Sequence, residues 1–287
     1  MSKLTNRLNL PEILLYAVRN DKYNSGDSWR TVTQLIAPPR IIQLQIEHAE
    51  EITEDVVDRL YTMQGQIAHG IIERASQELK DHGWISEERL FTEVLGKKVS
   101  GAFDLYHPKN RELIDVKYAS GWSAKKGEAK PEWVNQTNLL AHLLRLHGHK
   151  VAQIKVLLLI RDWSKPEARR NPDYPQDPAL YLSVPVWDDL KCAQFLKERV
   201  ALHLKAEQVL PDCTAEERWA KPDIWAIKKN DGAKAISGGL YTDELIAKKE
   251  LIRLGSNHKM EYRRGESTRC ELYCSAAPFC TQFKRSK

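Results

Sequence analysis

Apolar positions along the chain follow both helical and strand spacing, so helices and strands are expected to alternate. A helix is predicted where apolar residues recur every three or four positions, at Val56, Leu60, Met63, Ile67 and Ile71. Residues 131–147 predict a second helix, because proline suits the first helical turn. The apolar run at residues 156–160 is typical of a buried strand in a mixed sheet. Residues 161–186 contain five prolines and are expected to be irregular.

Toward the two ends of the chain the pattern indicates smaller elements. Residues 10–18 predict a short helix, and residues 187–200 an amphipathic one. Near the C-terminus, a strand–turn–strand is expected at residues 225–236, followed by a helix at residues 242–254.

Two short apolar runs, residues 101–105 and 113–117, carry acidic residues and a lysine. Asp115 and Lys117 are two positions apart, so they share one face of a strand. The link between the runs contains His-Pro-Lys-Asn, which suits the turn of a hairpin. Such a hairpin would bring Asp104 beside Asp115, with the ammonium group of Lys117 next to both.

Two carboxylates beside a lysine suit metal-dependent hydrolysis of phosphodiesters. Mg²⁺ is typically held by one or two carboxylates together with substrate phosphate and water. The bound metal lowers the pKa of its water and neutralises charge on the phosphate. A neighbouring lysine can orient that water and stabilise the developing charge. An exposed hairpin with an ordinary ion pair accounts for the same residues, since short patterns of this kind recur by chance.

Neighbouring elements offer further ligands for such a site. His69 and Glu73 lie four positions apart, on a face of the first helix that differs from its apolar stripe. His69 could bind a metal ion, and Glu73 could hold a second ion or a water; solvated surface residues are the alternative. Gln136, off the packed side of the second helix, could bind phosphate or water, or be an ordinary helical glutamine. Glu93, on the strand before Asp104, is a further candidate.

The order of these residues resembles the PD-(D/E)XK nuclease superfamily, in particular its RecB-like branch. That branch has a G-x-x-x-H helix, a G-x-x-D strand, a D/E-x-K strand and a Q-x-x-x-Y helix. The chain supplies these motifs in the same order, at residues 65–69, 101–104, 115–117 and 136–140. Leu140 stands where tyrosine is usual, so the resemblance does not extend to any DNA contact which that tyrosine makes.

The resemblance implies an α/β fold with a mixed central sheet flanked by helices, and Mg²⁺- or Mn²⁺-dependent hydrolysis of DNA. The stretches at residues 162–170, 214–219 and 269–280 look like those of phage and prophage nucleases of this branch. This resemblance implies an exonuclease of recombination or repair. The metal ligands it implies are His69, Asp104 and Asp115, with the main-chain carbonyl of Val116. The remaining roles fall to Lys117, which positions or activates water, to Gln136, which holds substrate or water, and to Glu73, beside a second ion. A non-catalytic DNA-binding or recombination-scaffold protein is the alternative function.

Cysteines gather in the C-terminal part of the chain. Three lie within eleven positions, at Cys270, Cys274 and Cys280, and two precede them, at Cys192 and Cys213. Four thiolates together bind an iron–sulfur cluster or zinc. The gaps differ from the C-x-x-C of zinc ribbons. Nothing at the start of the sequence resembles a secretory signal, so a disulfide framework is not expected.

Many RecB-like nucleases carry a 4Fe–4S cluster held by one upstream cysteine and a C-terminal trio. The resemblance therefore implies such a cluster on Cys270, Cys274, Cys280 and one further thiolate, with zinc the less favoured occupant. Cys213 is preferred as the fourth ligand because it lies in a polar, turn-like stretch. Cys192 stays the alternative, although a buried thiol is the ordinary expectation within an amphipathic helix.

Length and composition set the scale of the molecule. With 287 residues, 42% of them hydrophobic, the chain can bury one sizeable core plus an appendage. We expect a loosely attached segment at residues 1–30, a nuclease core at 31–209, and a cysteine-bearing extension at 210–287 packed on the core. A net charge of +5 permits a nucleic-acid partner without demanding one.

The expected partners follow from the resemblance. DNA comes first, as single strands or ends, followed by a recombination or annealing protein. Lys125 and Lys126, in the loop after Lys117, are expected to overhang the active site. No apolar run is long enough to cross a bilayer, so no membrane is expected. The cytoplasm of a bacterial or phage-infected cell is the expected compartment.

Overall fold

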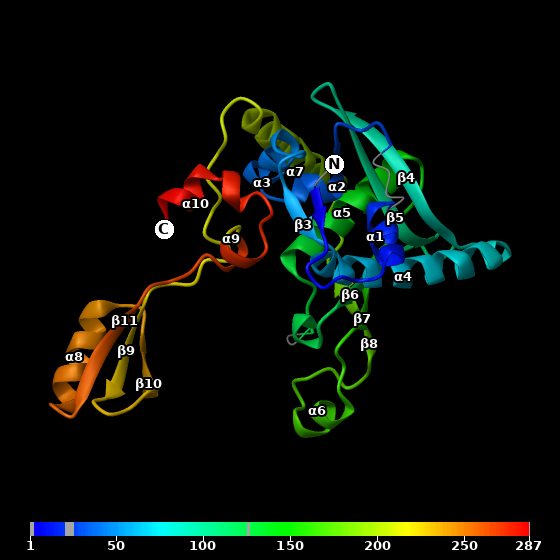
Figure 1. Ribbon diagram of the computed structural model, residues 1–287. Helices are drawn as coiled ribbons and strands as arrows, with labels where there is room; N and C mark the ends of the chain where they lie inside the picture. Colours follow the sequence, from blue (N-terminus) through cyan, green and yellow to red (C-terminus); the bar gives the residue numbers. More distant parts are fainter. Residues whose placement is uncertain (1–2, 21–25, 125–126, 287) are drawn as a thin grey trace. The chain divides into compact units, whose positions relative to one another are not determined.

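The computed structural model describes residues 3–20, 26–124 and 127–286 (Figure 1). The chain forms two compact units, residues 1–210 and 211–287. Lys125 and Lys126 lie outside the described residues. Within the described part, no helix is both long and apolar enough to cross a membrane.

A six-stranded mixed sheet forms the centre of the first unit. Its main path runs β2-β5-β6-β7-β8, and β4 also pairs with β5. The strands are β2 (Arg30–Thr31), β4 (Ile85–Val94), β5 (Lys97–His107), β6 (Glu112–Ala119), β7 (Gln153–Ile160) and β8 (Ala179–Val184). β6 and β7 are parallel, as are β2 and β5, whereas the other neighbours are antiparallel. The expected mixed sheet is therefore confirmed.

Helices flank this sheet and complete the first unit. They are α1 (Glu12–Arg19), α2 (Val32–Ile36), α3 (Pro39–Glu47), α4 (Val56–Glu78), α5 (Pro131–Leu146), α6 (Lys165–Arg170) and α7 (Asp189–Ala206). Two short strands, β1 (Lys3–Thr5) and β3 (Thr53–Asp55), pair in parallel outside the main sheet. Residues 161–186 were expected to be irregular, and this is wrong in part, because they contain α6 and the edge strand β8.

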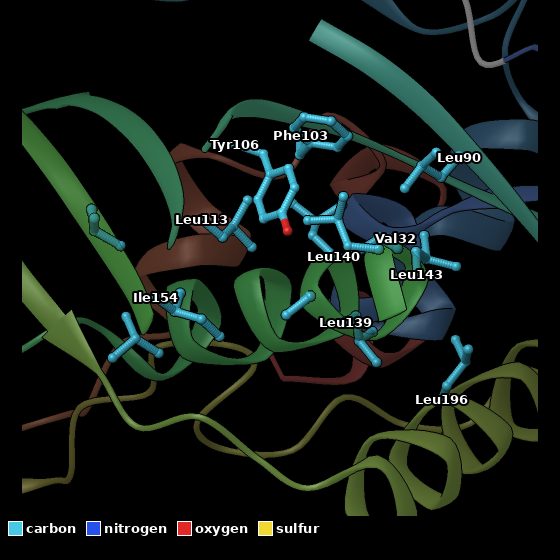
Figure 2. Packing of buried hydrophobic residues seen from close by; sticks show 14 of the residues in the cluster. Val32, Leu90, Phe103, Tyr106, Leu113, Leu139, Leu140, Leu143, Ile154 and Leu196 are labelled. Carbon is cyan, nitrogen blue, oxygen red and sulfur yellow. The ribbon is translucent and has the colours of Figure 1, made fainter. Parts of the chain in front are cut away.

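The core of the first unit surrounds α5, whose residues 137–144 are all buried. Phe103, Tyr106 and Leu113 of the sheet pack against this helix (Figure 2). Gly101 is required at this contact, because a Cβ there would lie 2.6 Å from a methyl group of Leu140. Leu140 is only 3% exposed, so the residue that replaces the motif tyrosine belongs to the core.

Helix α4 forms where predicted, but only the start of its apolar stripe, at Val56, is buried. Asp55 caps its first turn by accepting a hydrogen bond from the amide of Val57, at 3.1 Å. Ile67 and Ile71 are each more than half exposed. The helix instead turns the face with His69 toward the sheet, as the ion-pair distance from His69 to Asp104 shows.

The second unit contains a small antiparallel sheet of order β10-β9-β11. Its elements are β9 (Ile224–Lys229), β10 (Ala235–Tyr241), α8 (Glu244–Leu254), β11 (His258–Arg263), α9 (Thr268–Leu272) and α10 (Thr281–Arg285). The expected strand–turn–strand and the helix after it are confirmed by β9, β10 and α8. This sheet is inserted in the sequence between Cys213 and Cys270.

Candidate metal and active site

The predicted hairpin joins β5 to β6 and places Asp104 beside Asp115. The last paired residues of the two strands are Leu105 and Ile114, so Asp104 comes next, opposite Asp115. Oδ2 of Asp104 accepts a hydrogen bond from the amide of Val116, at 2.6 Å. The carboxylate thus takes the place of a main-chain acceptor where β5 turns away from β6, and this fixes its orientation.

Asp115 and Lys117 share one face of β6, as predicted. The Lys117 ammonium lies 2.7 Å from Oδ2 of Asp115, whose side chain is only 3% exposed. This ion pair gives the buried carboxylate a positively charged partner and holds the ammonium group beside Asp104 and Asp115.

His69, Glu87 and Asp104 form a cluster with the dimensions of a metal site. Nδ1 of His69 lies 3.5 Å from Oε1 of Glu87 and 3.5 Å from Oδ1 of Asp104. One ligand atom from each residue lies within 4.8 Å of the other two. Octahedral Mg²⁺, at roughly 2.1 Å from its ligands, keeps them about 3 to 4 Å apart. Small movements of these side chains would therefore enclose such an ion.

Glu87 reaches this cluster through an unusual backbone conformation. Its φ is 51°, near the start of β4, although residues other than glycine rarely adopt positive φ. The pairs on either side, Ser86 with Leu105 and Glu88 with Phe103, place Glu87 opposite Asp104. Such a conformation costs of order 1–3 kcal/mol and tends to occur at functional sites.

The sequence interpretation named Glu93 on this strand and missed Glu87. Glu93 pairs with Lys98, six residues further along β4 and about 20 Å away at strand spacing. The local sequence pattern gave no signal for Glu87, because its place depends on the register set by the β4–β5 turn. Leu95 and Gly96, both at positive φ, form the two-residue turn of the β4–β5 hairpin. A turn at this position sets a register in which Glu87 faces Asp104.

Electrostatic interactions in the cluster reflect crowded negative charge. Burial, and then the charge of Asp115, raise the pKa of Asp104 to about 7. Contact with the Glu87 carboxylate raises the pKa of the His69 imidazole, against the opposing effect of burial. A cation bound among these groups would relieve the repulsion between the carboxylates.

The remaining predicted residues lie on helices α5 and α4, outside the cluster. Gln136 is half-buried near the start of α5, and Glu73 is half-buried one turn beyond His69 on α4. Among the described residues, no hydrogen bond or ion pair joins either side chain to the cluster. The structure thus brings together four predicted residues, His69, Asp104, Asp115 and Lys117, and adds Glu87. Gln136 and Glu73 make no described contact with this cluster.

Comparisons with known proteins give structural similarity alone. No family model matches the chain. No curated protein matches it either. A crystal structure of SSO0001 is similar at 16% sequence identity and a TM-score of 0.45, over 67% of this chain and 85% of that one. A crystal structure of LHK-Exo in complex with dAMP is similar at 14% identity and a TM-score of 0.34, over 62% of this chain and 93% of that one.

In the second unit, Cys270, Cys274 and Cys280 are close in sequence, and hydrogen bonds link Cys213 to the same C-terminal segment. The side chain of Gln282 accepts from the amide of Cys213 at 2.8 Å and donates to its carbonyl at 2.9 Å. Gln282 follows Cys280 by two residues, so this pair of hydrogen bonds fixes Cys213 to the C-terminal segment. Burial, and then nearby Cys274 and Cys280, raise the pKa of the Cys270 thiol. None of the five cysteines forms a disulfide.

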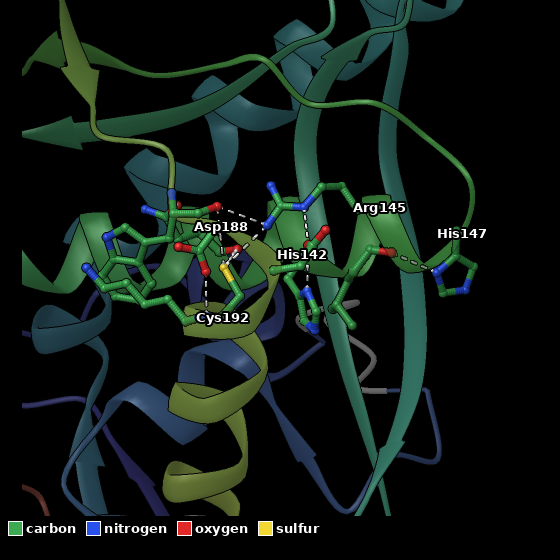
Figure 3. A network of polar contacts seen from close by, with 10 residues as sticks. His142, Arg145, His147, Asp188 and Cys192 are labelled. Atoms are coloured by element: carbon green, nitrogen blue, oxygen red, sulfur yellow. Dashed lines mark hydrogen bonds and ion pairs between the residues drawn. The ribbon is translucent and has the colours of Figure 1, made fainter.

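Cys192 has a different environment, inside the first unit (Figure 3). Its thiol is fully buried, donates to the carbonyl of Asn138 at 3.5 Å, and accepts from the Arg145 guanidinium at 3.3 Å. Arg145 also contacts Asp189 at 2.5 Å, so the thiol belongs to a polar network that joins α5 to α7. This is the environment of a structural thiol.

Proposed function

We propose that this protein is a metal-dependent deoxyribonuclease of the PD-(D/E)XK superfamily, in its RecB-like branch. The observation that carries the proposal is the meeting of His69, Asp104, Asp115 and Lys117 at the point where β5 leaves β6. Function follows from such a site rather than from the fold. A scaffold protein would have no need of all four residues.

The donor atoms of the site fit Mg²⁺ or Mn²⁺. Two carboxylates and an imidazole, from Asp104, Glu87 and His69, provide ligand atoms at suitable spacing. The carboxylate of Asp115, opposite Asp104, is expected to be a further ligand. The main-chain carbonyl of Val116 is expected to assist. When bound, the ion lowers the pKa of a water molecule and offsets charge on the phosphate.

The remaining roles in hydrolysis would belong to Lys117, Gln136 and Glu73. Lys117, anchored on Asp115, orients the attacking water and stabilises negative charge that develops on the phosphate. Gln136 holds substrate or water from the side of α5, and Glu73 supports a second ion. We further propose exonuclease action on single strands or DNA ends, in recombination or repair, with a recombination or annealing protein as partner.

We also propose a 4Fe–4S cluster on Cys213, Cys270, Cys274 and Cys280. The hydrogen bonds between Gln282 and Cys213 support Cys213 as the fourth ligand. Cys192 is instead bonded to Arg145 inside the first unit. The gaps between these cysteines differ from the C-x-x-C of zinc ribbons, so zinc is the less favoured occupant. The bound group would staple the two ends of this unit together.

The proposed function is tested by DNA degradation. Purified protein is incubated with end-labelled single- and double-stranded DNA in Mn²⁺ or Mg²⁺, beside Lys117→Ala and Lys109→Ala. Lys109 serves as control because it is an exposed lysine in the turn of the same hairpin. We expect Lys117→Ala to lose at least about 100-fold in rate, in the range of a lost electrostatic stabiliser, and Lys109→Ala to be unchanged. Undiminished degradation by Lys117→Ala contradicts the assignment, and intact DNA binding without cleavage by the wild type favours the scaffold.

A further inference from the structure

Arg161 lies at the edge of the sheet where the parallel strands β6 and β7 end. Ala119 pairs with Ile160, so Arg161 is the first residue beyond the paired strands. Its amide donates a hydrogen bond to the carbonyl of Ala119 at 3.0 Å, which extends the ladder by one step. Lys117 pairs with Leu158, three residues before Arg161. The arginine is therefore fixed to a rigid strand end, about 10 Å beyond Lys117 at strand spacing.

The guanidinium group of Arg161 is stacked on the ring of Tyr61. Its central carbon lies 4.5 Å from the centroid of that ring. Tyr61 belongs to α4, which lies against β6 and also carries His69. Both side chains are exposed, Tyr61 at 63%. Because a cation–π contact at an exposed site stabilises a fold only slightly, this pair calls for another explanation.

No carboxylate is paired with this guanidinium group in the part of the chain that the structure describes. The Arg161 side chain forms no hydrogen bond or ion pair with a described residue. The adjacent Asp162 uses its two oxygens to accept from the hydroxyl of Ser120 at 2.6 Å and from the amide of Gly121 at 2.8 Å. Stacking covers one face of the guanidinium group and leaves the N–H groups at its edge, which suit bidentate binding of phosphate.

Open space along α4 links the Arg161–Tyr61 pair to the proposed metal site. Tyr61, Gly65 and His69 follow one another at four-residue spacing, so they lie along one side of the helix. Between the other two, Gly65 has no neighbouring atom within 4 Å of the position that a Cβ would take. Tyr61 and His69 are about 12 Å apart along the helix axis, close to the separation of Lys117 and Arg161 along the sheet. A DNA strand at the metal site would thus meet Arg161 along this path.

We propose that Arg161, held by Tyr61, binds a backbone phosphate of the substrate strand. At a rise of 3.4 Å per nucleotide, this phosphate is about three nucleotides from the one beside Lys117, and fewer in an extended strand. Contacts to phosphate fix the position of a strand without reading its sequence. The inference rests on the proposed function, since the distance is counted from the phosphate at the metal ion.

The surroundings of Arg161 favour phosphate binding over a role in the fold. An arginine that stabilises the fold is bonded to main-chain carbonyls, as Arg199 is to those of Leu35 and Ala37, at 2.6 Å each. The side chain of Arg161 is exposed and donates to no described carbonyl. Its removal should therefore leave the free energy of unfolding nearly unchanged, which makes the inference testable.

The test measures binding of short single-stranded oligonucleotides in which one phosphate at a time is replaced by a neutral methylphosphonate. Every form of the protein carries Lys117→Ala and is used in Mg²⁺, so that the DNA stays intact. The oligonucleotides end in hydroxyl groups, so that only internal phosphates are tested. We expect one neutral position to weaken binding to the parent protein, and to have no effect once Arg161→Ala is added.

Arg161→Ala should also bind unmodified DNA roughly tenfold more weakly, in the range of one lost charged hydrogen bond. The slope of log K against log salt should fall by about 0.7, as expected for one phosphate contact fewer on a single strand. Arg161→Lys should recover the slope but only part of the affinity, because lysine lacks the planar fork. Tyr61→Phe should bind like the parent, whereas Tyr61→Ala should lose part of the effect.

Arg111→Asn is the matched control, because Arg111 is an exposed arginine at the other end of β6, and asparagine tolerates its φ of 53°. It should keep the affinity and the methylphosphonate pattern of the parent. An unchanged pattern in Arg161→Ala overturns the inference, as does an equal loss of affinity in Arg111→Asn or a lack of DNA binding by every form. The readout does not depend on cleavage: a wild type that binds DNA without cutting it contradicts the nuclease assignment, while a pattern lost only in Arg161→Ala still supports the phosphate site.

Discussion

Glu87 shows at the residue scale how the site draws on backbone strain. Its φ is positive, and its carboxylate lies 3.5 Å from Nδ1 of His69. Strain of this kind persists only where surrounding structure enforces it, here the paired residues on both sides. The strain is therefore consistent with selection for a ligand at this position.

Replacing Glu87 by glutamine should separate its role from that of Glu93. We expect Glu87→Gln to weaken Mn²⁺ binding by roughly 10- to 100-fold, with a matching loss of cleavage at limiting metal. Glu93→Gln, near the other end of β4, should behave like the wild type. The measurement is a metal titration followed by calorimetry and by DNA cleavage. Equal behaviour of the two variants would rule out Glu87 as a ligand.

His203 gives a pH prediction that is independent of the site. Burial, and then the charge of Arg199, lower the pKa of His203 to about 4, below its ordinary value of 6.5. The unfolded chain binds more protons between these values, so this residue's contribution to stability is present at neutral pH and is lost as pH falls from 6.5 to 4. His203 contacts the carbonyl of Leu35 at 3.1 Å.

Urea unfolding at several pH values tests this prediction. His203→Gln keeps a donor for Leu35 but does not titrate, so its stability should fall less than that of the wild type between pH 6.5 and 4. His82→Gln, at an exposed position, serves as control and should keep the wild-type slope. An identical pH dependence in wild type and His203→Gln would contradict the account.

At the scale of elements, the hairpin was predictable, whereas the register of its neighbour was not. Alternation along β6 and the turn residues after β5 are local features, so they were enough to bring Asp115 beside Asp104. Glu87 depends on the β4–β5 turn and on a strained residue, which propensities do not predict. The exposed stripe of α4, with Ile67 and Ile71, was not foreseen because helical spacing cannot say which face meets the sheet.

Two motif glycines should respond differently to substitution. Gly101→Ala should destabilise the protein by about 1–3 kcal/mol, because its Cβ would overlap Leu140. Gly65→Ala, inside α4 with nothing within 4 Å of its Cβ, should be neutral or stabilise by up to about 1 kcal/mol. Urea unfolding of both variants measures the difference. A stable Gly101→Ala would mean that α5 does not pack against β5 this closely.

At the scale of the whole molecule, the chain divides into a unit with the proposed metal site and a unit with the proposed cluster. The cysteine spacing in the sequence indicated the second unit, but the sheet between Cys213 and Cys270 separates these ligands by 57 residues. Neither spacing nor composition could choose between Cys213 and Cys192. The contacts of Gln282 and Arg145 favour Cys213.

Cluster loading tests this choice. Anaerobically purified wild type should be brown, with iron and sulfide in cluster proportion, and Cys213→Ala should lose most of both. Cys192→Ala should keep its iron, while losing some stability from the buried network around Arg145. Loss of iron in Cys192→Ala alone would reverse the assignment, and a colourless protein with zinc would exclude the iron–sulfur cluster.

The central claim is that Asp104 helps bind a metal ion that makes this protein cut DNA. Release of nucleotides from end-labelled single-stranded DNA tests it most directly, with wild type and Asp104→Asn compared in Mn²⁺ and in EDTA. The account predicts degradation by the wild type in Mn²⁺, none in EDTA, and a loss of at least about 100-fold in Asp104→Asn. Degradation that persists in EDTA, or equal rates for the two proteins, would contradict it.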